Sequence, residues 1–291
     1  MSPNRFDSVF RPALFADRVA LVTGGGTGIG RCIAHELAAL GATVVVTGRR
    51  LEPLEQTVAE IHADGGRAAC AALDIRDDEA VDRVVAEVVA DHGRLDFLVN
   101  NAGGQFVSGA ADIRPKGWRA VIDTNLNGTF WMSRAAFHAW MGDHGGAIVN
   151  IVADMWNGFP GMAHTGAARA AVVNLTHTLA IEWGANGVRV NAVAPGIVAS
   201  SGMKNYPDIV LEVTADLARR HPSGRLGTES EVSAAVCFLL SPAASFVTGT
   251  ALRVDGGASL AKAPMMPLDP HDAIEAWDGF HRAADLPEIL R

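Results

Sequence analysis

The chain contains little of what would place it in several common protein classes. Its three cysteines, Cys32, Cys70 and Cys237, are far apart, and none belongs to a C-x-x-C pair. This argues against a disulfide framework and a metal site, and it predicts free thiols in a reducing, cytoplasmic compartment. No run of 18 apolar residues is present, and the polar N-terminal sequence MSPNRFDSVF does not predict a signal peptide. A membrane-spanning helix is therefore not expected.

Basic charge and aromatic side chains are also scarce. The 24 Lys and Arg residues are outnumbered by 32 Asp and Glu residues, the formal net charge is -8, and no stretch is rich in Lys and Arg. Nucleic acid and anionic membranes are therefore not expected as partners. Aromatic residues make up 6% of the chain and include a single tyrosine, Tyr206. A mechanism that needs a tyrosine hydroxyl has only this residue to draw on.

Apolar residues and glycine, by contrast, are abundant, and they alternate in a regular way. Apolar runs such as RVALVTG, TVVVTG and AIVNIV are typical of buried parallel strands. Seven such strands alternate with helical patterns, which predicts one α/β domain with a doubly wound, Rossmann-type parallel sheet and helices on both faces. Helices are predicted near residues 30–40, 51–62, 78–91, 116–141, 164–184 and 229–240.

This domain is predicted to span residues 18–260. Residues 1–17 are expected to form an N-terminal arm, and residues 261–291 a C-terminal extension that docks against the core or a neighbouring subunit. Residues 198–228 form the least regular stretch, which is typical of a segment that covers a substrate.

A glycine-rich turn, TGGGTGIG, follows the first predicted strand and opens the first helix. Glycines there let the backbone approach a pyrophosphate, and the start of a helix supplies free N–H groups. A tight turn alone would also favour glycine, but the order of strand, turn, helix and strand favours dinucleotide binding. The candidate residues are Gly24, Thr27, Gly28, Ile29 and Gly30.

The end of the second strand predicts which dinucleotide binds. A carboxylate at this position would favour NAD(H), but Arg49 and Arg50 stand there instead. A guanidinium group can form two hydrogen bonds with a 2′-phosphate, so NADP(H) is the predicted cofactor and NAD(H) the weaker alternative. One of the two arginines could equally be a solvated surface residue.

The third and fourth strands also end in candidate cofactor residues. Asp74 and Ile75 end the third strand, where the carboxylate could meet the adenine amino group. Asn101, Ala102 and Gly103 end the fourth strand and could pack under the adenosine ribose. Each is ordinary at a strand end, but together they predict an adenosine site.

The motifs TGGGTGIG, LDI, NNAG, TNLNGTF, VNAVAPG and VDGG occur in an order and spacing that resembles the short-chain dehydrogenase/reductase family over roughly residues 17–260. The resemblance implies that Pro195, Gly196 and Ile197 complete the cofactor site. It also implies a catalytic Asn, Ser, Tyr and Lys, with Tyr four residues before Lys.

The catalytic residues of this family are only partly present. Arg169 stands at the Lys position, Thr165 at the Tyr position, and the sequence around Asp154 lacks the Ser; only Asn125 matches. Arg169 could hold the ribose of the nicotinamide nucleotide, but it is too basic to act as an acid or base.

Longer segments of the chain resemble two branches of this family. The stretch from Gly158 to Ser201 is similar to peroxisomal trans-2-enoyl-CoA and dienoyl-CoA reductases, whereas the segments NIVADMWNG and DGFHRA are similar to bacterial enzymes of citronellol and citronellal oxidation. The first branch implies reduction of a 2-enoyl thioester by NADPH, and the second implies oxidation of a branched acyclic alcohol. A catalytically degenerate NADP-binding protein is a third alternative.

Enoyl reduction needs hydrogen-bond donors at the thioester oxygen, and Asn125 and Thr165 are the candidates. Asp154 could donate a proton, or act as base in alcohol oxidation, or merely cap its loop. His164 could relay a proton or simply bond the backbone. Met155, Trp156, Phe159 and Met162 suit an acyl or isoprenoid chain, although they could equally anchor their loop.

The two helices that carry these catalytic positions also predict assembly. Their expected outer faces hold more apolar surface than one subunit easily buries, which predicts a homodimer or homotetramer. The residues concerned are Trp131, Phe137, Trp140, Leu175, Leu179 and Trp183.

Overall fold

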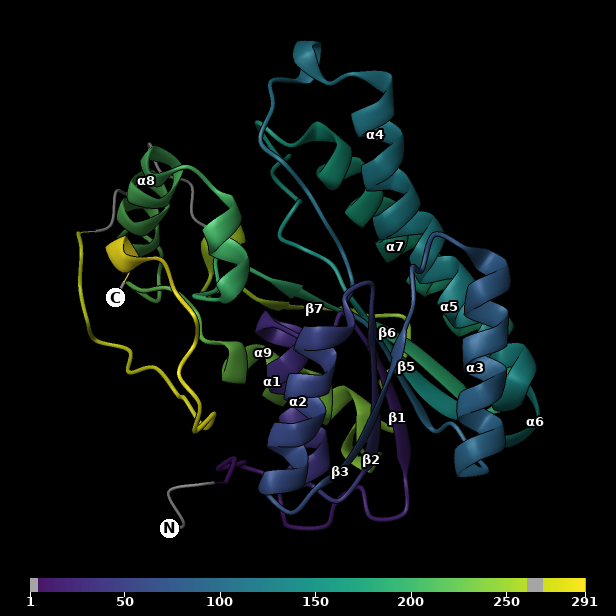
Figure 1. Ribbon diagram of the computed structural model, residues 1–291. Coiled ribbons are helices and arrows are strands. Elements are labelled where there is room, and N and C mark those ends of the chain that lie inside the picture. The colour runs from purple at the N-terminus through teal and green to yellow at the C-terminus, as the bar shows by residue number, and fades with distance from the viewer. Residues whose placement is uncertain (1–4, 261–268, 291) are drawn as a thin grey trace.

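Seven apolar strands form one parallel sheet in the order β3-β2-β1-β4-β5-β6-β7 in a computed structural model that describes residues 5–260 and 269–290 (Figure 1). The strand order reverses between β1 and β4, so the carboxyl ends of these two strands form the crevice where open α/β sheets bind ligands. The strands are β1 (Val19–Thr23), β2 (Thr43–Gly48), β3 (Arg67–Ala72), β4 (Phe97–Asn100), β5 (Gly146–Ile151), β6 (Val188–Pro195) and β7 (Ala251–Val254).

Helices cover both faces of this sheet, as Figure 1 shows. Successive strand residues point to opposite faces, so Val22 packs on one side with α1, α2 and α9, and Leu21 on the other with α3, α5 and α7. The predicted fold class is confirmed. The helices are α1 (Gly28–Ala39), α2 (Leu51–Ala63), α3 (Asp78–His92), α4 (Pro115–Ile122), α5 (Gly128–Ala136), α6 (Gly142–His144), α7 (Ala163–Glu182), α8 (Asp208–Arg219) and α9 (Glu229–Leu240).

Two predicted segments differ from the structure. The helix expected over residues 116–141 is a helical path from α4 to α6 that contains two π-helical turns, Asp123–Asn127 and Phe137–Met141. The stretch 198–228, expected to be irregular, contains α8 and a 3₁₀ turn, Ser201–Asn205. The apolar residues of α8 recur every four residues, a helical spacing that the sequence analysis overlooked.

The residues expected on an outer apolar face are largely covered within the subunit. Leu179 is buried, and the other five are half-buried against the cluster under α3, α5 and α7. Trp183, for example, stacks on Phe137 with ring centroids 4.4 Å apart. This face is therefore less exposed than the sequence analysis expected, and the homodimer or homotetramer stays a prediction.

The arm and the extension meet on the outer side of α1. Phe6 and Phe280 are buried together with Cys32, and the backbone N–H of Asp7 donates to the Gly279 carbonyl at 2.8 Å. The extension also passes beside α8 in Figure 1. None of the helices in the described part of the chain is both long and apolar enough to cross a membrane.

Candidate functional site

A cavity of about 570 Å³ lies at the carboxyl ends of β1 to β4. It is lined by most of the predicted cofactor residues, which come from the turn after β1 and from the ends of β2, β3 and β4. They are Gly24, Thr27, Gly28, Ile29, Gly30, Arg49, Arg50, Asp74, Ile75, Asn101, Ala102 and Gly103. Ser200, Ser201 and Gly202 line it from the covering segment. The fold thus brings residues from four strand ends to one crevice.

The backbone conformation at one position of the turn, and the close packing at another, require glycine. Gly28 has φ +58°, a left-handed conformation that favours glycine. A Cβ at Gly30 would lie 2.3 Å from the Gly24 carbonyl oxygen and 2.3 Å from Nδ2 of Asn101, which leaves no room for a side chain. This tight packing holds the start of α1 open toward the cavity, where its backbone N–H groups suit a pyrophosphate.

Asn101 braces this turn from the end of β4. Its Nδ2 donates to the carbonyl oxygens of Thr23, at 2.9 Å, and Gly24, at 3.2 Å. In return, Oγ1 of Thr23 accepts the backbone N–H groups of Asn101 and Ala102. These hydrogen bonds hold the ends of β1 and β4 together. Asn101 therefore positions the glycine-rich turn.

The far end of the cavity is basic. Arg49 and Arg50 are both exposed, and Arg76, which the sequence analysis did not single out, also lines the cavity. Nε of Arg76 donates a hydrogen bond to Oδ1 of Asp74 at 2.9 Å, and this bond lowers the pKa of the Asp74 carboxyl group. Asp74 is thus engaged by a guanidinium group, which differs from the expected contact with adenine alone. The signal was the run Leu-Asp-Ile-Arg directly after β3.

Three predicted cofactor residues lie elsewhere. Pro195 ends β6 and is buried, and Gly196 packs against Asp255. Ile197 lines a separate cavity of about 310 Å³ between the covering segment and the end of β7. All three therefore lie beyond the 570 Å³ cavity as the described residues define it.

Asn125 is fully buried in the first π-helical turn, between α4 and α5. Its amide nitrogen donates to the carbonyl oxygens of Gly104 and Val121, both at 2.8 Å, and its Oδ1 accepts the backbone N–H of Gly104 at 3.2 Å. Both amide hydrogens are thus committed to the backbone. The expected role as a donor to substrate does not fit this geometry, whereas positioning of the loop at Gly104 does.

Arg169 reaches the same loop from α7. Its Nη1 donates to the Ile151 carbonyl at 2.6 Å, and a Cβ placed on Gly103 would lie 2.3 Å from its Nη2. Burial lowers the pKa of Arg169 to about 10, so the group stays cationic at neutral pH. No carboxylate in the described chain pairs with it, and its buried Nε lacks a hydrogen-bond partner there. A buried cation with an open donor fits polar groups of a bound nucleotide.

Thr165 and His164, at the start of α7, are both fully buried. The backbone N–H of Thr165 donates to Nδ1 of His164 at 2.8 Å, and its hydroxyl lies 3.2 Å from the same nitrogen. Burial lowers the pKa of His164, which favours the neutral ring, although a hydrogen bond with the Met162 backbone raises it. The Nε2 of His164 is buried and has no partner among the described residues, and the ring packs edge-on against Phe106. His164 therefore has a buried ring nitrogen that is free to bond a ligand.

Asp154 stands on the loop between β5 and α7. No hydrogen bond within the described residues connects it to Asn125, Thr165 or Arg169. Burial raises the pKa of Asp154, and the charge of Asp255 at the end of β7 raises it further. Its Oδ1 is buried without a hydrogen-bond partner in that same described part. The raised pKa favours the protonated acid over the carboxylate at a given pH.

Apolar side chains stand beside the catalytic positions on two loops. The backbone N–H of Ser108 donates to the Gly161 carbonyl at 2.8 Å, which joins the loop after β4 to the loop before α7. Phe106, Val107 and Trp156 on these loops are each about two-fifths exposed, although Trp156 also lies under the Arg253 guanidinium. This surface suits an apolar chain, because it is not needed to fill the core.

Comparisons with known proteins show which proteins this chain is similar to. The family model described as enoyl-(acyl carrier protein) reductase matches residues 24–259. A Bacillus subtilis protein assigned as 2,4-dienoyl-CoA reductase is 41% identical over 85% of this chain and 98% of its own length. The structure of the citronellol catabolism dehydrogenase AtuB of Pseudomonas aeruginosa is 51% identical, with a TM-score of 0.79, and the match covers 87% of this chain and all of that one.

A third relative bears on the cofactor. The structure of a Beutenbergia cavernae protein, assigned as an NAD(P)-dependent gluconate 5-dehydrogenase, holds NADP at low occupancy. It is 38% identical to this chain, with a TM-score of 0.80, and the match covers 86% of this chain and all of that one.

The close packing at Gly30 gives a direct test of the cavity. Gly30→Ala should weaken binding of NADPH by at least about tenfold, because the added Cβ must push Asn101 and the Gly24 carbonyl away. Titration by protein fluorescence measures this. Gly184→Ala is the matched control, since no atom lies within 4 Å of its Cβ position. Equal binding by the two variants would contradict the assignment of the turn.

Proposed function

The chain belongs to the short-chain dehydrogenase/reductase family, and we propose that it uses NADPH to reduce the carbon–carbon double bond of a 2-enoyl thioester that carries an acyl or isoprenoid chain. The observation that carries this proposal is the pair of residues at the start of α7. Thr165 and Arg169 stand where the family has Tyr and Lys, and neither gives up a proton near neutral pH. A carbonyl oxygen that becomes an alcohol must take a full proton, whereas an enolate oxygen needs only hydrogen bonds.

The cofactor proposal rests on the basic end of the cavity. Arg49, Arg50 and Arg76 gather where the adenosine ribose of a dinucleotide would lie, and a 2′-phosphate there would meet guanidinium groups rather than a carboxylate. Bound NADPH supplies the hydride that adds to the β-carbon. Arg169 and the loop at Gly103, held by Asn125, would orient the nicotinamide end.

His164 is the proposed donor at the thioester oxygen. Its Nε2 is buried without a partner in the described residues, and a hydrogen carried on this nitrogen would form a stronger hydrogen bond as negative charge develops on that oxygen. The backbone N–H of Thr165 donates to Nδ1, and a donation from its hydroxyl, 3.2 Å from the same nitrogen, would favour that tautomer and make Thr165 a positioning residue. The carboxyl group of Asp154, whose pKa burial raises, is the proposed source of the proton for the α-carbon.

A second candidate reaction is oxidation of a branched acyclic alcohol such as citronellol. The 51% identity to a citronellol catabolism dehydrogenase favours it, and Asp154 would then act as the base. The two reactions require opposite protonation states of the same carboxyl group. Their pH profiles therefore differ in direction.

Comparative titration tests the choice of dinucleotide. NADPH is expected to bind at least about tenfold more tightly than NADH, because only NADPH has a 2′-phosphate that can pair with a guanidinium group. Such a pair contributes a few kcal/mol at most to binding, so Arg49→Ala should remove most of the difference in affinity. Arg219→Ala, on the exposed side of α8, is the control variant. Equal affinity for both dinucleotides, unchanged by Arg49→Ala, would overturn the proposal.

Paired assays separate the two reactions. With NADPH and a medium-chain 2-enoyl-CoA, we expect turnover that falls as the pH rises through the raised pKa of Asp154, and Asp154→Asn should remove this dependence. His164→Phe, which keeps the packing with Phe106, should lower kcat about a hundredfold. Thr165→Ala should also lower kcat, and Thr165→Ser should restore it.

The control for these variants is His177→Phe, since His177 is exposed on the same helix. With NADP⁺ and citronellol, little turnover is expected. Turnover of citronellol alone that rises with pH, is abolished by Asp154→Asn and is unchanged by Thr165→Ala would establish the second reaction instead.

A further inference from the structure

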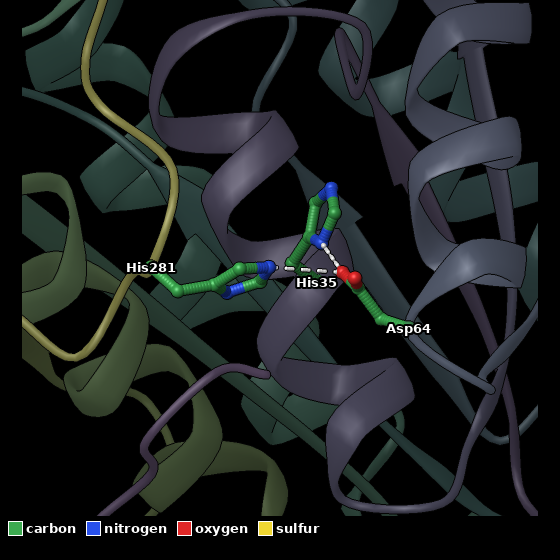
Figure 2. A group of neighbouring side chains, drawn as sticks. All are labelled: His35, Asp64 and His281. Carbon is green, nitrogen blue, oxygen red and sulfur yellow. Dashed lines mark ion pairs between the residues drawn. The ribbon is translucent and has the colours of Figure 1, made fainter. Parts of the chain in front are cut away.

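Two histidines and a carboxylate from three distant parts of the sequence converge outside the cofactor cavity. His35 comes from α1, Asp64 ends α2, and His281 comes from the C-terminal extension (Figure 2). One ligand atom from each lies within 4.8 Å of the other two. Their side chains are 2%, 13% and 11% exposed, so the cluster is a built feature of the interior rather than a chance meeting on the surface.

We propose that His35, Asp64 and His281 bind a zinc ion that fastens the C-terminal extension to α1 and α2. Zinc takes imidazole nitrogens and carboxylate oxygens at about 2.0–2.2 Å, so neighbouring ligand atoms of a tetrahedral site lie about 3.3 Å apart. The Nδ1 of His35 lies 3.4 Å, and the Nε2 of His281 lies 3.1 Å, from Oδ2 of Asp64. Figure 2 shows both rings directed at this carboxylate.

Most of the proposed ligand atoms form no hydrogen bond in the described structure. Asp64 Oδ2 and both ring nitrogens of His281 are buried and lack hydrogen-bond partners there. Buried polar atoms are almost always satisfied, and two of these three, Oδ2 of Asp64 and Nε2 of His281, face each other at 3.1 Å, which indicates a missing partner between them. A cavity of about 20 Å³ next to His35 and Asp64 has room for one water molecule, which could supply the fourth ligand.

Hydrogen bonding around His35 favours a metal over a direct histidine–carboxylate bond. Nε2 of His35 lies 3.1 Å from Oε2 of Glu60, and this carboxylate takes the ring hydrogen. In the neutral ring with this tautomer, Nδ1 presents a lone pair to Oδ2 of Asp64, 3.4 Å away. Two facing lone pairs repel unless a cation lies between them. A carboxylate behind a ligating histidine is also the usual outer support of a zinc site.

The neighbouring arginines leave this position open. Arg282 donates from Nη2 to Oδ1 of Asp64 at 2.7 Å, which occupies the other oxygen of that carboxylate. Arg31 pairs with Glu60 at 2.7 Å. The two guanidinium groups and the two carboxylates therefore offset one another, and Oδ2 of Asp64 remains directed at the histidines.

The site would act on the covering segment through the extension. Residues just before His281 hold the start of α9: Oγ1 of Thr228 donates to the Trp277 carbonyl at 2.7 Å, and Ser230 donates to Asp278 at 2.8 Å. Arg225 also donates to the carbonyls of Ile274 and Glu275. Because no reacting group lies near it, the proposed zinc is structural.

The test is zinc binding by the full chain after chelation and dialysis. Calorimetry with ZnSO₄ should give one site per chain, and zinc should raise the Tm reversibly. His281→Ala should lower the affinity more than about 100-fold, since loss of an outer partner alone costs 10- to 100-fold. Glu60→Gln should cause that smaller loss, and His177→Ala, which removes an exposed histidine, should cause none.

Binding of Co²⁺ gives a second readout, because the visible absorption of a four-coordinate site is strong and should disappear in Asp64→Asn. If His281→Ala does not fold, the zinc-dependent Tm and the cobalt spectrum of the parent chain still decide. Absence of a one-to-one site, or a site that survives both His281→Ala and Asp64→Asn, would overturn the proposal.

Discussion

The close approach of the turn after β1 to the end of β4 is the contact on which the cofactor cavity depends. Gly30 packs against the Gly24 carbonyl and Asn101 with no room for a Cβ, and Asn101 and Thr23 exchange hydrogen bonds across the same gap. This contact fixes the start of α1 at the point where the strand order reverses. The adenosine end and the catalytic end of the cavity are then placed by neighbouring strand ends.

A second tight contact, at Gly103, joins this frame to the catalytic residues. Asn125 and Arg169 both close on that glycine, one from a π-helical turn and the other from α7. Both side chains donate hydrogen bonds to backbone carbonyl groups, so they position the loop at Gly103 and the nicotinamide end of the cofactor site. The hydrogen bond to the substrate oxygen must then come from another donor. The buried pair His164 and Thr165 supplies that donor in our account.

The sequence predicted the sheet, both helical layers and most of the cavity lining, because strand ends and glycine turns are local signals. It could not predict features that depend on contacts between distant residues. Asn125 was expected to be a donor, and only the structure shows that Gly104 and Val121 use its hydrogens. The unpartnered nitrogen of His164 depends on how the loops pack around α7, and the cluster at His35 joins residues nearly 250 positions apart. α8 had a helical spacing in the sequence, so that error was avoidable.

The central claim is that hydride reaches a carbon–carbon double bond rather than a carbonyl group. Its most direct test is to supply NADPH deuterated at C4 of the nicotinamide together with equal amounts of a 2-enoyl-CoA and citronellal, and to locate the deuterium in the products by mass spectrometry. The account predicts deuterium on the β-carbon of the saturated thioester. Deuterium found only on the carbinol carbon of citronellol would contradict it.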